Sequence, residues 1–539
     1  MSAIATAQVP AASSTRVKLD HPLDVRAILA FLGVLALGLF FMAYSIYSDV
    51  SASGDESQKA ILPFLLLGVA MLIALGFEFV NGFHDTANAV ATVIYTHSLR
   101  PQIAVVWSGL WNLAGVVTST GAVAFGIVSL LPVELIIQVG SKAGFAMVFA
   151  LLIAAIIWNL GTWWFGLPAS SSHSLIGSIV GVGIANALMR GQDGTSGVDW
   201  SQVTNIGNAL LWSPVFGFVL AAALLLLMKF IVRVPKLYTA PESDTPPPLW
   251  IRGLLVLTCT LVSFFHGSND GQKGMGLIML ILIGVMPTAY ALNRALPESH
   301  MATFISASDD AAKIINAKAA GYNVIGDPRP VVTDYVHSHK IAEGTYPSLA
   351  ALVKQISDEV SQYGSLAKAP FDKVQNIRND MYVASEAVRI LGKDKESELK
   401  PEDVKVLNAY KKELDLSTKF IPLWVKVCVA LALGMGTMIG WKRIVVTVGE
   451  KIGKSHLTYG QGAAAEIVAA ATIGAADGLG LPVSTTHVLS SGVAGTMAVN
   501  GSGIQLSTVR NLALAWVLTL PAAIVLSGTL FFVFRGIFP

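Results

Sequence analysis

One short phrase occurs twice in the chain, as GLPASSSHSLIGSIVG at 166–181 and as GLPVSTTHVLSSGVAG at 480–495. Each copy places a Gly-Leu-Pro break before three consecutive hydroxyl residues and a histidine. A proline followed by Ser or Thr is typical of a helix start, where the first amides have no intrahelical partner. Those amides, the positive end of the helix dipole and the hydroxyls together favour an oxyanion. A single copy would more often be structural, but two copies with His173 and His487 at the same offset indicate a binding site.

Long apolar runs place both phrases in a membrane protein. Apolar residues make up 53% of the chain and charged residues 13%, and runs of about 18 or more apolar residues favour a polytopic membrane protein over several soluble domains. The formal charge of +2 is too small to suggest a nucleic-acid partner. Cys259 and Cys428 both lie in apolar segments, so we expect neither a disulfide nor a thiolate metal site.

A second phrase also occurs twice, as NGFHDTAN and as FFHGSNDGQKG, so that Gly82 corresponds to Gly267 and Asp85 to Asp270. Each copy interrupts a long apolar span with polar residues, and we therefore expect a broken helix in each half of the chain. Counted between their first glycines, the two kinds of phrase lie 84 residues apart in the first half and 213 in the second. The difference predicts an inserted segment in the second half.

The insertion is much more charged than the rest of the chain. It holds 17 of the 36 Lys and Arg residues and 18 of the 34 Asp and Glu residues, so we interpret it as a small solvated helical domain with a structural or regulatory role. The expected segments are a disordered tail (1–26), an extra N-terminal transmembrane helix (27–48), a first transport repeat (61–232), a proline-rich connector (233–249), the start of a second repeat (250–292), the soluble helical insertion (293–420) and the remainder of the second repeat (421–539).

The number of crossings predicts the orientation of the two repeats. Each repeat has five predicted crossings, and an odd number forces two repeats to point in opposite directions across the membrane. With the extra helix, the expected fold is an all-α polytopic membrane protein with about 11 transmembrane helices in two inverted repeats. Most short-loop basic residues fall on one face, with Lys142, Arg190 and Arg535 as exceptions. The positive-inside rule then places the N-terminus in the cytoplasm, and the insertion and the C-terminus in the periplasm.

The hydroxyl phrases supply hydrogen-bond donors, and Asp85 and Asp270 of the other repeated phrase supply negative charge. A carboxylate within a membrane protein is costly and usually functional, and inverted repeats with broken helices are typical of secondary transporters. An anion and two carboxylates repel one another unless a cation enters as well or the anion itself carries a proton. Phosphate carries such a proton at neutral pH and sulfate does not, so the pattern favours cotransport of phosphate. An enzyme is disfavoured, because no pair of nucleophile and base is evident.

The phrases NGFHDTANAVAT, GLPASSSH, FFHGSNDGQKG and GLPVSTTH resemble the paired signature motifs of the inorganic phosphate transporter (PiT) family, over about 61–535. The resemblance implies secondary transport of inorganic phosphate driven by a cation gradient. For the bacterial branch it also implies an inner-membrane protein, proton coupling, and uptake of neutral complexes of phosphate with a divalent metal such as magnesium or zinc. No cofactor is expected besides the coupling proton.

The sequence departs from the commoner motif of that family, Gly-Ala-Asn-Asp-Val-Ala-Asn, at two positions. His84 stands in place of the first Asn, and Lys273 stands in place of the final Asn of the second copy. A fixed ammonium group should repel sodium, and a histidine can titrate near neutral pH. Both departures therefore favour proton over sodium coupling.

The candidate site residues form two groups, and none is predicted to hold a resident metal. The predicted substrate ligands are Ser170, Ser171, Ser172, Ser484, Thr485, Thr486, Asn88, Gln272 and Lys273. The residues predicted to hold the coupling ion or proton are Asp85, Asp270, His84, Asn269, His173 and His487. Glu78 and Glu466 are interpreted as packing or gating groups near the site.

The expected function is proton-coupled phosphate import by alternating access, and three alternatives stay open. The first is a carrier of sulfate or another oxyanion on the same scaffold. The others are a passive anion channel and a phosphate sensor with the insertion as its reporting domain. The expected partners are phosphate, protons and the lipid bilayer, and a homodimer is left open.

Overall fold

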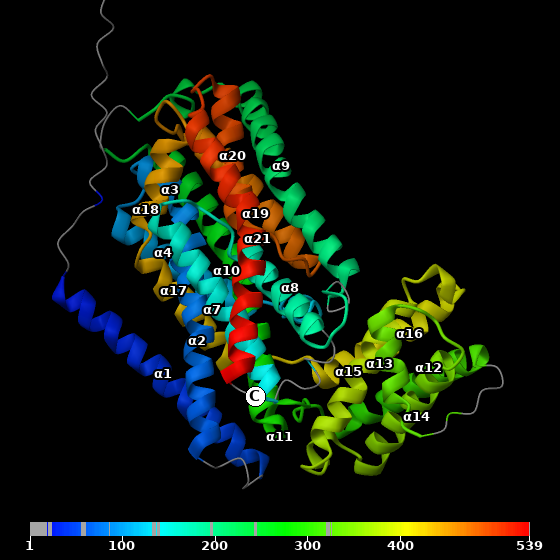
Figure 1. Cartoon of the computed structure of the whole chain (residues 1–539). Helices are drawn as coiled ribbons and strands as arrows, with labels where there is room; N and C mark the ends of the chain where they lie inside the picture. Colours follow the sequence, from blue (N-terminus) through cyan, green and yellow to red (C-terminus); the bar gives the residue numbers. More distant parts are fainter. Residues whose placement is uncertain are drawn as a thin grey trace, which may run out of the picture.

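The computed structural model describes residues 19, 24–54, 61–85, 87–131, 136, 141–194, 198–241, 245–319, 324 and 326–537. Within these ranges the secondary structure is helical, apart from one isolated bridge between Gly453 and Ile504. Figure 1 shows a long bundle of helices and a smaller group of helices beside one end of it. Most of the predicted N-terminal tail, 1–26, lies outside the described residues.

The bundle contains the long apolar helices. Its elements are α1 (Val25–Ser53), α2 (Ile61–Asp85), α3 (Ala87–Tyr95), α4 (Pro101–Thr118), α5 (Ala122–Val128), α7 (Lys142–Trp164), α8 (Ser171–Met189), α9 (Trp200–Ile231), α10 (Leu249–Val285), α11 (Pro287–Tyr290), α17 (Leu423–Met438), α18 (Lys442–Val446), α19 (Tyr459–Gly478), α20 (Thr485–Asn500) and α21 (Leu506–Ile537). In the described ranges, seven helices are long and apolar enough to cross a membrane, or nine if each of two bent pairs forms one span. Because α17 and α20 have only 16 residues each, less than the roughly 20 of a regular crossing, the count of about 11 stays a prediction.

The apolar stretch at 103–126 forms two helices. α4 and α5 meet at an angle of 75°, and Gly121 precedes α5 with a φ of +88°. Glycine suits this left-handed conformation because it has no Cβ to clash with the backbone. After the bend, α5 packs against α10.

The predicted break in the second acid-bearing helix is wrong. α10 runs without interruption from Leu249 to Val285, through the whole FFHGSNDGQKG phrase. The polar side chains of this phrase bond to one another at helical spacing: Lys273 lies beside Asp270 at i,i+3 and Gln272 donates to the carbonyl of Ser268 at i,i+4. The phrase contains no proline, so no backbone donor is lost and the helix continues. In the first half, α2 ends at Asp85 and α3 begins at Ala87, but Thr86 lies outside the described residues and the break there stays a prediction.

Helices of the first half of the chain pack against helices of the second half. α2 packs against α17 and α10 against α4, while α8 packs against α21 and α20 against α9. The matched glycines allow two of these contacts: a Cβ at Gly82 would lie 2.1 Å from the carbonyl oxygen of Leu433, and one at Gly267 would lie 2.2 Å from that of Asn112. Any side chain at either position would force the backbones apart.

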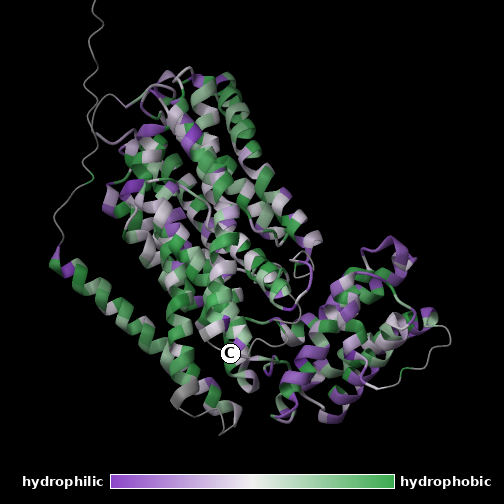
Figure 2. Cartoon of the chain, in the orientation of Figure 1, coloured by the Kyte–Doolittle hydropathy of each residue, from purple (hydrophilic) through white to green (hydrophobic). Residues whose placement is uncertain are grey.

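The smaller group, which we call the appendage, consists of five helices that pack on one another. They are α12 (Glu298–Lys318), α13 (Arg329–Ser338), α14 (Thr345–Tyr363), α15 (Val374–Leu391) and α16 (Pro401–Thr418). Figure 2 shows that it is more hydrophilic than the bundle. α14 buries Leu349, Val353, Ile356 and Val360, the spacing of one apolar helix face.

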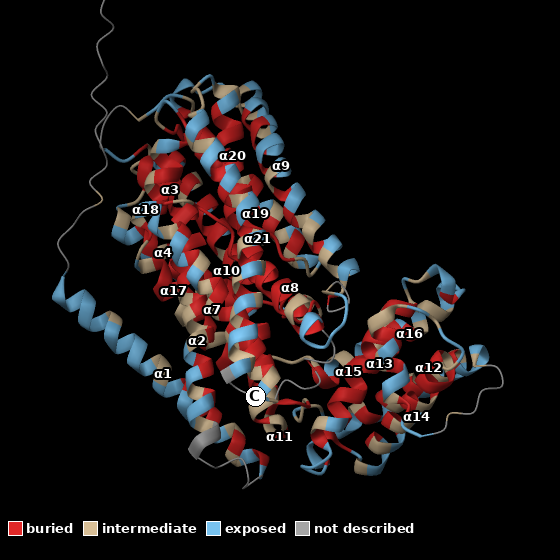
Figure 3. Cartoon of the chain, in the orientation of Figure 1, coloured by how far each residue is buried: buried red, intermediate tan, exposed pale blue. Residues whose placement is uncertain are grey.

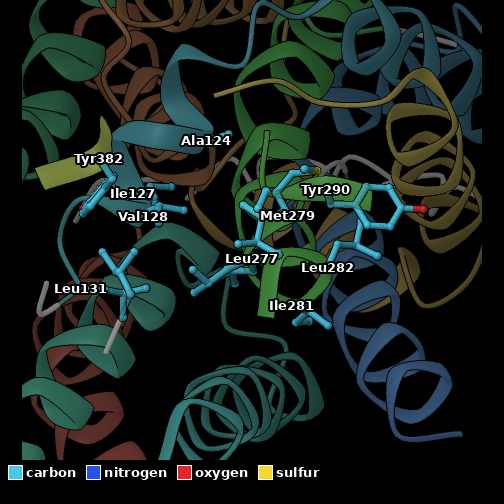
Figure 4. Close-up of a cluster of buried hydrophobic side chains, with 14 of the residues drawn as sticks. Ala124, Ile127, Val128, Leu131, Leu277, Met279, Ile281, Leu282, Tyr290 and Tyr382 are labelled. Carbon is cyan, nitrogen blue, oxygen red and sulfur yellow. The ribbon is translucent and has the colours of Figure 1, made fainter. Parts of the chain in front are cut away.

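The appendage contacts the end of the bundle at which α11 and the C-terminal end of α21 lie (Figure 1). Tyr382 of α15 lies beside Ile127 and Val128 of α5 (Figure 4). The same apolar cluster includes Leu277 and Leu282 near the end of α10. Apolar packing therefore joins the appendage to the bundle.

The N-terminal helix α1 contacts the bundle mainly through its last turns, and most of its length is exposed (Figure 3). Near its end, Asp49 accepts hydrogen bonds from the Tyr290 hydroxyl and the Trp424 indole, both at 2.9 Å. The exposed face carries residues such as Leu37 and Phe40, as suits a helix that faces lipid.

Candidate functional site

Asp85, at the end of α2, lies where the two hydroxyl phrases meet. Its Oδ2 accepts a hydrogen bond from Ser171 at 2.5 Å, and its Oδ1 accepts one from Thr486 at 2.6 Å. Asn88 of α3 donates to Thr486 at 3.1 Å. His84 places Nδ1 3.1 Å from Asp85 and Nε2 3.1 Å from the Thr162 hydroxyl. Hydroxyls from both halves of the chain thus hold one buried carboxylate.

Asp270, in the middle of α10, has a different partner. The ammonium group of Lys273 lies 2.6 Å from Asp270 Oδ1 and donates to the Ser172 hydroxyl at 2.5 Å. Ser172 in turn donates to the carbonyl of Val483 at 2.9 Å. All these side chains are buried. Lys273 therefore connects the second acid with the first hydroxyl phrase.

The two acids lie close together, with a histidine beside them. The ligand atoms of Asp85, His266 and Asp270 all lie within 4.8 Å of one another. His266 also forms a hydrogen bond with Asn112 at 2.9 Å, which fixes its ring. Two carboxylates and an imidazole form a donor set for a cation. Sequence reasoning missed His266, although its position one helical turn before Asp270 was a usable signal.

The hydroxyl phrases form helix starts, as their sequence predicts. The chain turns at Gly166 and Gly480, with φ of +65° and +67°, before α8 and α20 begin. Ser170 and Ser484 are the N-cap residues, and their hydroxyls accept from the amides of His173 and His487 at 3.2 and 3.1 Å. These two predicted ligands thus satisfy one free amide in each helix.

Three polar atoms at these helix starts are buried and form no hydrogen bond within the described part of the chain. They are Thr485 Oγ1, His173 Nδ1 and His487 Nε2. The His173 and His487 rings lie 4.6 Å apart between centroids, and His487 stacks on Trp516 at 4.2 Å. Buried polar atoms almost always have a partner in protein, ligand or water, so these three atoms are available to a polar ligand.

Asn269 and Gln272 both form hydrogen bonds with other parts of the bundle. Asn269 contacts the chain that precedes α20, and Gln272 contacts α5 and the end of α19. Asn269 donates to the carbonyl of Leu481 at 3.1 Å. Gln272 donates to Asp477 at 2.7 Å and accepts from the amide of Val123 at 3.0 Å. All polar atoms of Gln272 are therefore engaged with protein, and its predicted role as a substrate ligand stays a prediction.

Asp477 is a third acid that sequence reasoning missed. It lies at the end of α19 and also accepts from Ser268 at 2.6 Å. Asp477 stands three residues before the second hydroxyl phrase, and the corresponding position before the first phrase is Trp163, so a comparison of the two halves gave no signal. Glu78 and Glu466 are both buried, and their contacts are with Asn81 at 3.4 Å and with Thr258, respectively. Their interpretation as packing or gating groups stays a prediction.

These features define a class of protein. Apolar helices of membrane-spanning length enclose a buried centre of paired acids, hydroxyls and cationic groups, as in helical membrane transporters. The chain belongs to the phosphate transporter family, whose sequence model matches residues 81–527.

Curated relatives agree with this assignment. The low-affinity inorganic phosphate transporter PitA of Escherichia coli (strain K12) is 41% identical over 488 residues, covering 87% of this chain and 96% of that protein. PitB of the same strain is 39% identical over 505 residues with the same coverage. A solved structure titled "The sodium-dependent phosphate transporter" matches with a TM-score of 0.48 and 19% identity, covering 88% of this chain and 100% of that one.

Proposed function

We propose that the protein is a secondary active transporter that imports inorganic phosphate by proton symport. The observation that carries the proposal is the meeting of both hydroxyl phrases at two adjacent buried acids: Ser171 and Thr486 at Asp85, and Ser172, through Lys273, at Asp270. A centre built from both halves can open to either side when the halves move relative to each other. The names of the E. coli relatives, which are low-affinity inorganic phosphate transporters, support phosphate as the substrate.

The proposed scaffold is a pair of inverted repeats that start at α2 and α10. The contacts between the halves support it. In the proposed repeats α10 corresponds to α2 and α17 corresponds to α4, and α2 contacts α17 while α10 contacts α4. In the same way α20 corresponds to α8 and α21 corresponds to α9, and α8 contacts α21 while α20 contacts α9. This pattern is expected when two similar units are interlocked around a shared axis.

Phosphate is proposed to bind at the starts of α8 and α20. The Thr485 hydroxyl and the two ring nitrogens, His173 Nδ1 and His487 Nε2, offer hydrogen bonds that no described residue uses. The amide ends of both helices favour an anion at the same place. A protonated phosphate can also donate to a carboxylate, which makes Asp85 compatible with an anionic substrate.

Proton rather than sodium coupling is proposed because of Lys273. Its ammonium group lies at the distance from Asp270 that suits a direct ion pair, 2.6 Å. A sodium ion bound there would meet a fixed positive charge, which repels it. Asp85 has no lysine or arginine ion pair in the described residues, so it is the acid that we expect to take the proton.

The transported form of phosphate is proposed to include neutral complexes with a divalent metal such as magnesium or zinc. The Asp85 carboxylate and the His266 imidazole are ligand types that such metals accept, and a neutral complex, unlike a bare sodium ion, is not repelled by Lys273. The metal would be cargo that travels with phosphate.

Radiolabelled phosphate uptake into proteoliposomes tests the proposed function. We expect accumulation above equilibrium under an imposed proton gradient, and its collapse when a protonophore is added. Downhill flux alone would indicate a channel, and the absence of flux would indicate a sensor. Full competition by sulfate at equal concentration would indicate a general oxyanion carrier.

A further inference from the structure

A cavity of about 770 Å³ separates the appendage from the bundle. On the bundle side its wall includes Ala122 at the start of α5 and Leu479 and Gly480 in the turn before α20. On the appendage side its wall consists of residues of α15 and α16 and of the chain after each helix. The cavity therefore lies over the turn that leads to the second hydroxyl phrase.

Cationic side chains predominate in the lining of this cavity. Five cationic and two acidic side chains line it, which leaves an excess of three positive charges. The cationic residues are Arg389, Lys393, Lys411, Lys412 and Lys419, and the acidic ones are Glu386 and Asp415. By contrast, the appendage as a whole carries nearly equal numbers of acidic and basic residues. The positive charge is thus concentrated on the wall that faces the bundle.

Both acids of the lining are already neutralised by ion pairs. Arg389 lies 2.5 Å from Glu386. Lys411 and Lys419 lie 2.5 and 2.8 Å from Asp415. Arg389 also reaches Asp199, the N-cap of α9, at 3.3 Å. The Arg389–Asp199 pair joins the appendage to the bundle, whereas the other pairs lie within the appendage.

Lys393 and Lys412 carry two of the three excess charges, and the third is offset by Asp199, which lies outside the lining and pairs with Arg389. Both side chains are exposed, and neither forms an ion pair with any residue that the structure describes. Lys393 follows the end of α15, and Lys412 lies in α16. An unpaired ammonium group at the wall of a concave surface raises the local concentration of anions, because the low-dielectric walls focus its field.

The cavity wall is directly joined to the candidate site. Val123, next to Ala122 in the wall, donates its amide hydrogen to Gln272 of α10. Leu481, next to Gly480, accepts a hydrogen bond from Asn269. Two residues adjacent to the cavity wall are therefore hydrogen-bonded to α10, the helix that carries Asp270.

We infer that this cavity is a vestibule that attracts free phosphate ions and holds them transiently before they enter the transport site. The inference rests on the proposed function and gives the appendage a role in it. Free phosphate is favoured over a lipid headgroup because the wall adjoins residues hydrogen-bonded to α10, the helix of Asp270. The cations act by charge and not by fixed contacts, so their effect should depend on salt.

The test compares two charge-reversed double variants in proteoliposomes of zwitterionic lipid, without divalent metal and with equal salt on both sides. Lys393→Glu with Lys412→Glu alters the vestibule. Lys313→Glu with Lys373→Glu makes the same change of net charge at exposed appendage positions outside the cavity lining. At low ionic strength we expect the vestibule variant to raise the KM for phosphate about 3- to 10-fold with unchanged Vmax. Near 1 M salt, where the Debye length is about 3 Å, the difference should vanish.

Each outcome is decisive. If the vestibule variant and the control variant have equal KM values at low salt, the inference that the cavity is a vestibule is wrong. Phosphate uptake by the unaltered protein would still support the proposed function in that case. An effect that appears only when anionic lipid is added would assign the lysines to lipid headgroups and would also overturn it. If the unaltered protein takes up no phosphate, the proposed function fails first and the vestibule with it. The neutral pair Lys393→Gln with Lys412→Gln should give a smaller rise in KM of the same sign.

Discussion

The two buried acids occupy corresponding positions in the two halves of the chain, yet their surroundings differ. Asp85 accepts from Ser171 of its own half and from Thr486 of the other. The corresponding hydroxyls for Asp270 would be Thr485 and Ser172. Instead, Lys273 stands between Asp270 and Ser172.

The surroundings of the two acids also differ at Thr485. Its hydroxyl forms no hydrogen bond within the described residues, whereas its counterpart Ser171 donates to Asp85. One lysine therefore converts a repeated arrangement into an asymmetric one, in which one acid is held by neutral donors and the other by a fixed cation. We therefore propose that the two acids have different roles: Asp85 exchanges the coupling proton, and the charge of Asp270 stays compensated by Lys273.

The largest effect is expected from Asp85→Asn. Hydrogen bonds to a charged group contribute about 1.5–3 kcal/mol each, and Asp85 accepts two from hydroxyls. We expect proton-coupled phosphate uptake to fall at least about 100-fold. Initial rates in proteoliposomes measure this, with the exposed Asp309→Asn as the control. Uptake at the level of the control would contradict a coupling role for Asp85.

Lys273→Asn tests whether the lysine causes the asymmetry. Removing one partner of a buried ion pair costs about 3–5 kcal/mol, because the remaining charge is left unpaired. We expect the variant to be less stable in choline chloride and to recover stability in sodium chloride, since sodium can then occupy the space beside Asp270. Thermal unfolding in the two salts and sodium-dependent uptake are the measurements. Equal melting temperatures in both salts would show that Asp270 does not form a cation site.

Thr486→Val and Thr485→Val compare two neighbouring hydroxyls with different partners. Thr486→Val removes a donor to buried Asp85 and should lower stability by about 1–3 kcal/mol. Thr485→Val removes a hydroxyl that forms no hydrogen bond among the described residues, so it should leave stability nearly unchanged and raise the KM for phosphate. Denaturation and uptake kinetics separate the two effects. Equal loss of stability in both variants would count against the assigned difference.

Glu386 lies in α15 of the appendage, outside the membrane-spanning helices, and can be compared with the two buried acids of the bundle. We expect its substitution to have the smallest effect on stability. Burial alone would raise the pKa of Glu386, but Lys419 and Arg389 hold it below its ordinary value of 4.5. A lowered pKa in the folded state stabilises the protein above pH 4.5, and this stabilisation is lost as the pH falls through the folded pKa. We expect the appendage to loosen under acid, because these pairs are lost, and to do so less steeply in Glu386→Gln. Proteolysis of the appendage as a function of pH measures this, and identical profiles would contradict it.

Several elements of the site could be predicted because they depend on local sequence. The proline breaks and the hydroxyl N-caps follow from backbone chemistry within a few residues, and Ser170 and Ser484 lie where that chemistry requires. The continuous path of α10 was not predicted, because a polar run in an apolar span resembles a break. Whether such a run breaks a helix depends on partners three or four residues away and on other helices.

His266 and Asp477 were missed for different reasons. His266 lies one helical turn from Asp270, so its nearness to that acid follows from helical spacing once α10 is known to be continuous. Asp477 acts across helices, through Ser268 and Gln272, and no pattern in the chain connects these positions.

The sequence by itself determined the family, the apolar helices, the duplicated phrases and the helix starts, because each of these is encoded in residues that are neighbours in the chain. Only the tertiary structure decided which acid meets which hydroxyl, that Lys273 takes the place of a donor, and that basic residues of the appendage line a cavity over the second hydroxyl phrase. These facts depend on contacts between segments that are far apart in the chain, and such contacts are set by the packing of whole helices.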